Sequence, residues 1–156
     1  MSSSCLTLGL RPVADGARER RLLLAADDGD SVHITGWELA RLDLALAAGT
    51  PVLVCKDPRV LEAVAQRFRG SIAVVYGAGM PAIVVMHALS AFAASRAGMP
   101  YHGGFDWPGV AIVNRLVAEV GVRPWLMSAC DYEDAARAYG LPLSGLQVTR
   151  RRFSRA

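Results

Sequence analysis

The chain has 156 residues, which is the length of a single domain. It is 53% hydrophobic and 20% charged, a composition that excludes an intrinsically disordered chain. The formal net charge is +3, but four arginines lie within the last seven residues, and without them the remainder carries −1. Charge alone therefore gives no indication of a large nucleic-acid-binding surface on the body of the domain.

The three cysteines, Cys5, Cys55 and Cys130, are widely spaced and form no CxxC pair, which favours a reducing compartment. No stretch reaches the roughly 18 apolar residues that a membrane helix needs. Residues 1–12 lack the charged start and apolar run of a signal peptide. We therefore expect a cytoplasmic protein that makes no membrane contact.

Short apolar or β-branched runs predict about four to five strands. Two of them, residues 51–55 and 71–76, are continuously apolar, as is typical of strands buried on both faces of a sheet. The expected strands cover residues 32–35, 51–55, 71–76, 99–102 and 123–127.

Helices are expected between these strands. Pro58 and Pro108 suit the first position of a helix, and Gly121 suits a helix end. Ser128 or Asp131 is the expected cap of the last helix. The expected helices cover residues 37–46 (as a short helix or two turns), 58–68, 81–97, 108–120 and 131–139.

Alternating strands and helices predict an α/β fold, with a mostly parallel sheet and helices on both faces. We expect one domain over residues 1–145 and a basic tail over residues 146–156. The tail arginines Arg150, Arg151 and Arg152 are candidates for phosphate contact, and the alternative is a solvated terminus without a partner.

Ligands of such folds bind at the carboxyl ends of the strands, here the loops over residues 55–58, 76–81 and 102–108. Asp106 has two interpretations: a carboxylate that caps the helix after it, or a ligand for Mg²⁺. Lys56 and Arg59 either contact phosphate or are simply exposed to solvent at the start of the helix.

Three further features of these loops leave alternatives open. The sequence Gly77-Ala78-Gly79 is a tight turn or a weak phosphate-loop signal, because the full GxGxxG pattern is missing. His102, beside the last loop, is a candidate for contacting phosphate or orienting Asp106. Trp107 either stacks on a base or covers the helix start.

Several motifs, in the same order, resemble one family. The segment YHGGFDWPGVAIVNRL, residues 101–116, resembles the third strand, loop and helix of a Toprim domain. Together with CKDPRVLEAV, residues 55–64, VHITGWEL and RPWLMSACDYEDA, it is similar to the Wadjet nuclease subunit JetD and its relatives. These share their Toprim domain with the A subunit of topoisomerase VI. The similarity covers residues 8–149.

The resemblance implies a DNA nuclease that uses Mg²⁺ and works with an SMC-type motor complex and its kleisin. Members of this group carry a long amino-terminal DNA- and partner-binding region, and we expect this chain to lack it or to meet it as a separate fragment. The implied metal ligands are a glutamate in CENPxVLEAA and two aspartates in YHGDFDWPG.

The sequence departs from this pattern at two of the three acids. Lys56 stands in the place of the glutamate and Gly104 in the place of the first aspartate, so that Asp106 alone remains. Asp57 is one residue away from the lost glutamate, and in extended backbone this shift turns a side chain to the opposite face, which makes it a weak metal ligand. We expect Lys56 to lie near Asp106 and to replace the cation.

Three hypotheses follow. We favour a Toprim-like domain of a JetD-type nuclease subunit that is catalytically impaired and acts as a DNA- or partner-binding module, or is a decayed remnant. The alternative is residual Mg²⁺-dependent DNA cleavage through Asp106 and Asp57. A third and weaker hypothesis is nucleotide binding at the loop over residues 77–79.

Overall fold

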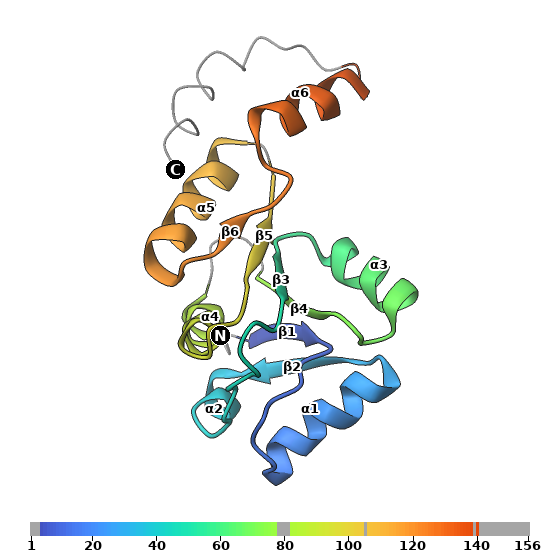
Figure 1. Ribbon diagram of the computed structural model, residues 1–156, viewed down its shortest axis with the longest axis vertical. Helices are drawn as coiled ribbons and strands as arrows, with labels where there is room; N and C mark the ends of the chain where they lie inside the picture. The colour runs from blue at the N-terminus through green and yellow to red at the C-terminus, as the bar shows by residue number, and fades with distance from the viewer. Residues whose placement is uncertain (1–3, 78–81, 105, 139, 141–156) are drawn as a thin grey trace.

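The computed structural model describes residues 4–77, 82–104, 106–138 and 140 (Figure 1). Six strands form one sheet in the order β2-β1-β4-β3-β5-β6. The strands are β1 (Ser4–Leu8), β2 (Ser31–Thr35), β3 (Val52–Cys55), β4 (Ala73–Tyr76), β5 (Pro100–His102) and β6 (Arg123–Pro124). The helices are α1 (Ala17–Asp28), α2 (Gly36–Leu39), α3 (Pro58–Phe68), α4 (Ile83–Ala94), α5 (Trp107–Val120) and α6 (Ala129–Ala138).

The sheet is mostly parallel. Strands β4, β3, β5 and β6 pair in parallel, whereas β1 pairs antiparallel with both of its neighbours, β2 and β4. The α/β class and the parallel core are therefore confirmed. The sheet has one strand more than the upper end of the predicted range, because β1 was not expected.

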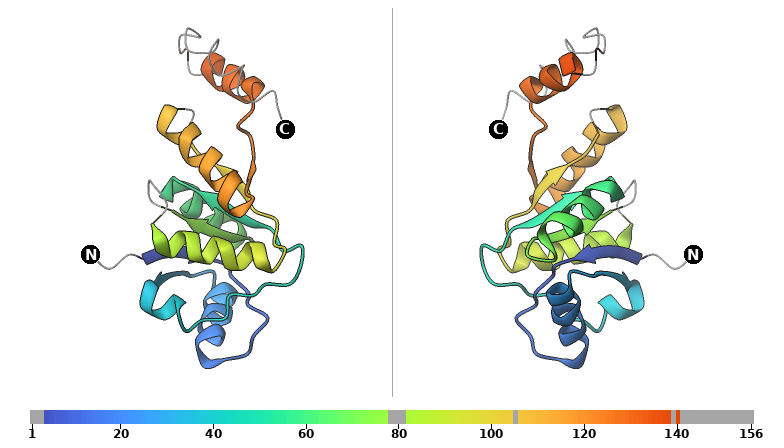
Figure 2. Two further views of the ribbon diagram at one scale, coloured as in Figure 1. Left: turned by 90° about the vertical axis from the view of Figure 1, so that its left-hand side faces the viewer. Right: turned by 90° about the vertical axis from the view of Figure 1, so that its right-hand side faces the viewer.

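Alternate side chains of the central strands enter two separate hydrophobic clusters, one on each face of the sheet. In β4, Val75 belongs to the larger cluster, which contains side chains of α4 and α5. The neighbouring Val74 belongs to the smaller cluster, which contains Leu61 of α3. Helices α4 and α5 thus cover one face and α3 covers the other (Figures 1 and 2).

Several predicted elements have different bounds in the structure. Of the helix expected over residues 37–46, only the four-residue α2 forms. Leu44 and Leu46 are both buried, and side chains two residues apart share a face in extended backbone, not in a helix. The strand expected over residues 123–127 is shortened to β6, whose Pro124 offers no N–H to a ladder. The last helix begins at Ala129, before its expected start, and α1 was not predicted at all.

Helix ends follow the local chemistry of the sequence. Asp57 and Asp106 accept hydrogen bonds from backbone amides of the helices that they precede, and a proline stands in the first turn of each helix. Gly121 ends α5 with φ of 71°, a left-handed conformation that favours glycine. No helix within the described ranges has the length and apolar character that crossing a membrane requires.

Candidate functional site

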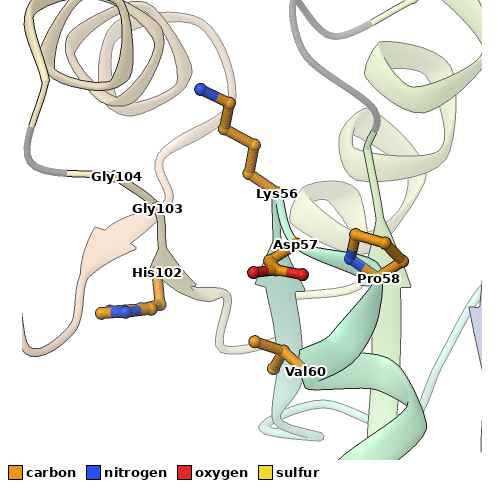
Figure 3. Close-up of a pocket in the computed structure, with 7 residues that line it drawn as sticks. All are labelled: Lys56, Asp57, Pro58, Val60, His102, Gly103 and Gly104. Atoms are coloured by element: carbon orange, nitrogen blue, oxygen red, sulfur yellow. The ribbon is translucent and has the colours of Figure 1, made fainter.

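The strongest candidate site is a pocket of about 500 Å³ at the carboxyl ends of β3 and β5. After β3 the chain enters α3 on one face of the sheet, and after β5 it enters α5 on the other. Such a point of divergence between neighbouring parallel strands leaves a crevice in which α/β proteins bind ligands. Its lining residues are Lys56, Asp57, Pro58, Val60, His102, Gly103 and Gly104 (Figure 3).

The register of the sheet places the two site loops beside each other. Cys55 and His102 are paired across β3 and β5, and they are the last residues of these strands. Lys56 and Gly103 therefore leave the sheet from adjacent positions. Residues from two of the three expected ligand loops, those over residues 55–58 and 102–108, line this one pocket.

Asp57 is held by the start of its own helix. Its Oδ1 accepts a hydrogen bond of 2.9 Å from the backbone N–H of Arg59, and its Oδ2 accepts one of 2.7 Å from the Arg59 guanidinium. Hydrogen bonds from the Arg59 side chain are the main cause that lowers the pKa of Asp57. The Arg59 side chain is exposed, but its charge is compensated by this carboxylate.

Asp106 caps α5. Its Oδ1 accepts a hydrogen bond of 2.8 Å from the backbone N–H of Gly109. Gly109 is buried, and a Cβ at this position would collide with the carbonyl oxygen of Gly104. The glycine at position 109 therefore allows the site loop to close against the start of α5.

Position 104 lies directly beside the Asp106 carboxylate. A Cβ built on Gly104 would lie 3.3 Å from Asp106 Oδ1 and 3.6 Å from Asp106 Cγ. An aspartate at position 104 would therefore bring a second carboxylate next to the first. The two carboxylates would repel each other unless a cation lay between them.

Lys56 is half-buried in the pocket wall, and its ammonium group points away from Asp57 (Figure 3). Lys56 forms no salt bridge within 4.0 Å among the described residues. The expected pairing of Lys56 with Asp106 is therefore not present as an ion pair. Lys56 is also the only lysine of the chain, whose other basic residues of fixed charge are all arginines. Lys56 therefore brings the positive charge of its ammonium group to the pocket wall.

His102 is oriented by a backbone carbonyl. Its Nδ1 lies 3.0 Å from the carbonyl oxygen of Trp125, and the two rings are T-shaped with centroids 6.2 Å apart. A carbonyl oxygen only accepts, so Nδ1 carries the proton and donates it. In the neutral imidazole Nε2 is then the acceptor. No direct bond between His102 and Asp106 is present among the described residues.

Tyr101 is a site residue that the sequence did not reveal. Its side chain is buried, and its hydroxyl has no hydrogen-bond partner within the described part of the chain. A Cβ on Gly103 would lie 2.7 Å from this oxygen, so the hydroxyl lies directly beneath the pocket wall. Burial is the main cause that raises the pKa of Tyr101, and the charges of Cys55 and Asp106 add to it. The alternation of β5 signals that Tyr101 points inward, but no sequence pattern shows an unpartnered hydroxyl.

The residues present do not fit the Mg²⁺ site that the family resemblance implies. In the described ranges, no group of three or more His, Cys, Asp or Glu side chains is placed to hold a metal ion. Asp57 is bound by Arg59 and Asp106 by Gly109. A hard divalent cation requires converging oxygen ligands, and here a lysine, Lys56, lines the pocket.

Several predicted features lie outside the described residues. These are Phe105, most of the loop over residues 77–81, and the tail with Arg150, Arg151 and Arg152.

Gly77 follows β4 and lines a small internal cavity together with Cys55 and Tyr101. Burial is the main cause that raises the pKa of Cys55 to about 12.

A comparison with protein families gives one match. The model described as "Protein of unknown function C-terminus (DUF2399)" matches residues 32–152, which is more than half of the chain. The match contains both site loops, β3 to β6 and α2 to α6. A search of curated proteins returns no match.

Proposed function

Because the chain belongs to the family described as Protein of unknown function C-terminus (DUF2399), we propose that it is a Toprim-like domain related to JetD-type nuclease subunits that binds DNA phosphate without a metal ion. In this proposal the pocket at the carboxyl ends of β3 and β5 contacts the DNA backbone. The cleavage chemistry implied by the resemblance is lost.

The observation that carries the proposal is the environment of Lys56. Three converging carboxylates are stable together only with a divalent cation, which polarises a phosphate for attack. Here the pocket presents an ammonium group without an ion pair among the described residues, while each nearby aspartate is bound at a helix start. A phosphate oxygen is the natural partner for this group, because anions are attracted by an uncompensated cation.

The partners in the proposal come from the family resemblance. They are DNA and the subunits of an SMC-type complex with its kleisin, or a separate polypeptide that supplies the amino-terminal region. Such partners would add DNA contacts to that of Lys56 and raise the affinity above that of the isolated chain.

Residual endonuclease activity would require a different arrangement of the aspartates. Asp57 would have to leave Arg59, and Asp106 would have to leave the amide of Gly109, before both could face one metal ion. A plasmid-nicking assay with Mg²⁺ and Mn²⁺ tests this alternative. The proposal predicts no nicking by the wild type, whereas nicking that Asp106→Ala abolishes would support the endonuclease.

DNA binding is tested by fluorescence anisotropy with a labelled duplex in EDTA, as a function of salt. We expect wild-type binding, and we expect Lys56→Gln to weaken it several-fold and to reduce the salt slope by about 0.9, the value for one phosphate contact. Arg67→Gln is the matched control, since it removes one positive charge near the other end of α3. No duplex binding at low salt, or equal binding by Lys56→Gln, would refute the proposal.

The single lysine allows a second test on the wild-type chain. Besides the amino terminus, Lys56 is the only amine of the chain that acylating reagents modify. Acetylation removes the charge of a lysine and methylation keeps it. We expect acetylated protein to lose DNA affinity and reductively methylated protein to retain it. Equal affinity of the two would show that the charge of Lys56 is not used.

A further inference from the structure

All three tryptophans of the chain are exposed. Trp37, Trp107 and Trp125 are 64%, 60% and 49% accessible to solvent. Proteins bury tryptophan to a high degree on average, and tryptophan is enriched at interfaces. The exposed indoles therefore offer aromatic surface for contact with a partner.

Two of these tryptophans follow elements that end at the same edge of the sheet as the pocket. Trp107 is the first residue of α5, directly after Asp106, and Trp125 directly follows β6 (Figure 1). Trp125 also holds His102, which lines the pocket. The pocket at the ends of β3 and β5 thus has an exposed indole at the start of the following helix and another at the end of the neighbouring strand.

The backbone beside Trp125 is strained. Leu126 has φ of 53°, a left-handed conformation that is costly for a leucine, and its side chain is 51% exposed. Trp125 and Leu126 therefore expose apolar surface to solvent from a segment with a strained backbone. Strain of this kind is concentrated at binding and catalytic sites.

We infer that Trp107 and Trp125 are stacking platforms for the bases of a single-stranded nucleic acid whose backbone phosphate is bound by Lys56. The inference rests on the proposed function and specifies its substrate as unpaired rather than duplex DNA. Planar aromatic groups stack on exposed indoles, and an anion pairs with an ammonium group. A nucleotide unit carries both.

The size of the pocket agrees with this class of ligand. Its volume of about 500 Å³ lies within the roughly 300–1,000 Å³ of small-molecule sites, which is enough for one nucleotide unit. Stacking on exposed aromatic side chains combined with a cationic groove is the general mode of sequence-tolerant single-strand binding. We therefore expect little base preference.

Trp37 provides the internal control. It lies in α2 next to the edge strand β2, which β1 and β4 separate from β3. The Arg41 guanidinium lies 4.1 Å from its ring centroid, so one face of the indole is already occupied. Trp37 is as exposed as the other two tryptophans, but it does not lie at the pocket end of β5 and β6.

The test is a titration of the full chain with an oligothymidine of about 12 nucleotides, a length within the site sizes of single-strand binding folds. Binding is followed by anisotropy of the labelled oligonucleotide. Trp107→Ala and Trp125→Ala are each expected to weaken binding about 5- to 150-fold, the effect of losing one stacked base. Trp37→Ala is expected to bind like the wild type. Equal binding by Trp107→Ala, Trp125→Ala and the wild type would overturn the inference.

Two further probes separate the inference from the proposed function. Duplex of the same length is expected to bind more weakly than the single strand and to depend on Lys56 but not on Trp107 or Trp125. Duplex binding without any tryptophan effect on the single strand would overturn the inference and leave the proposed function standing. No binding of either DNA would overturn both. Thymidine monophosphate binding as tightly as the oligonucleotide would show a free-nucleotide site and overturn the single-strand assignment.

Discussion

Asp106 Oδ1 accepts a hydrogen bond of 2.8 Å from the backbone amide of Gly109, so the one acid that matches the metal-ligand pattern implied by the resemblance serves as a helix cap. This relationship predicts the effect of substitutions. Asp106→Ala should lower the free energy of unfolding by about 1 kcal/mol, the usual value for a lost cap, and Asp106→Asn should change it little. Urea denaturation measures both variants. An equal loss in both would show that the charge matters and not the cap.

The unpartnered hydroxyl of Tyr101 leads to a second prediction. A buried polar group without a partner costs free energy, so Tyr101→Phe should leave the free energy of unfolding unchanged or raise it by about 1 kcal/mol. The pKa of Tyr101 is raised by burial, so the folded state keeps the proton that the unfolded chain releases near pH 10. The wild type should therefore lose stability above that pH, and Tyr101→Phe should lose less. A destabilisation of more than about 1 kcal/mol at neutral pH would show that the hydroxyl has a partner.

Two buried thiols predict a further loss of stability in alkali. Burial is the main cause that raises the pKa of Cys5 to about 11 and that of Cys55 to about 12, from an ordinary value of 9.0. A raised pKa in the folded state contributes stability that is complete below pH 9.0 and is lost as pH rises toward 11 to 12. Chemical denaturation under reducing conditions measures this slope between pH 8 and pH 11. Cys5→Ala and Cys55→Ala should flatten it.

Cys130 is the matched control for this slope, because its side chain is exposed. Cys130→Ala should show the pH dependence of the wild type. The comparison uses slopes and not absolute stabilities, since removing a buried thiol group also opens a cavity. A slope that only Cys130→Ala changes would contradict the assignment to the buried thiols.

The fold class was predictable because its signal is local. Residues 51–55 and 71–76 are continuous apolar runs, and they form the adjacent parallel strands β3 and β4. Strand β1 was missed because Ser4 and Thr7 interrupt its apolar residues, and its antiparallel pairing is set by contacts distant in sequence. Helix α1 could have been delimited by Gly29, which ends it with φ of 79°.

The candidate site was predictable in place but not in its bonds. Parallel strands bring their carboxyl ends to one edge, which is why the loops containing Lys56 and His102 could be expected to meet. The partner that each side chain selects depends on distances that sequence does not give. The sequence allowed two interpretations of Asp106, and only the structure shows its bond to Gly109. The positions of Tyr101 and Trp125 beside the pocket likewise follow from tertiary packing.

The proposed loss of metal binding is tested most directly by calorimetric titration of Mn²⁺ into the wild type and into the double variant Lys56→Glu and Gly104→Asp. The Cβ expected at position 104 lies 3.3 Å from Asp106 Oδ1, so the double variant should gather three carboxylates and bind the ion in a 1:1 ratio, in agreement with the preference of such cations for converging oxygen ligands. The wild type should give only the heat of dilution. Tight, stoichiometric binding of Mn²⁺ to the wild type would contradict the account, and a double variant that binds no metal would show that the site has been placed on the wrong residues.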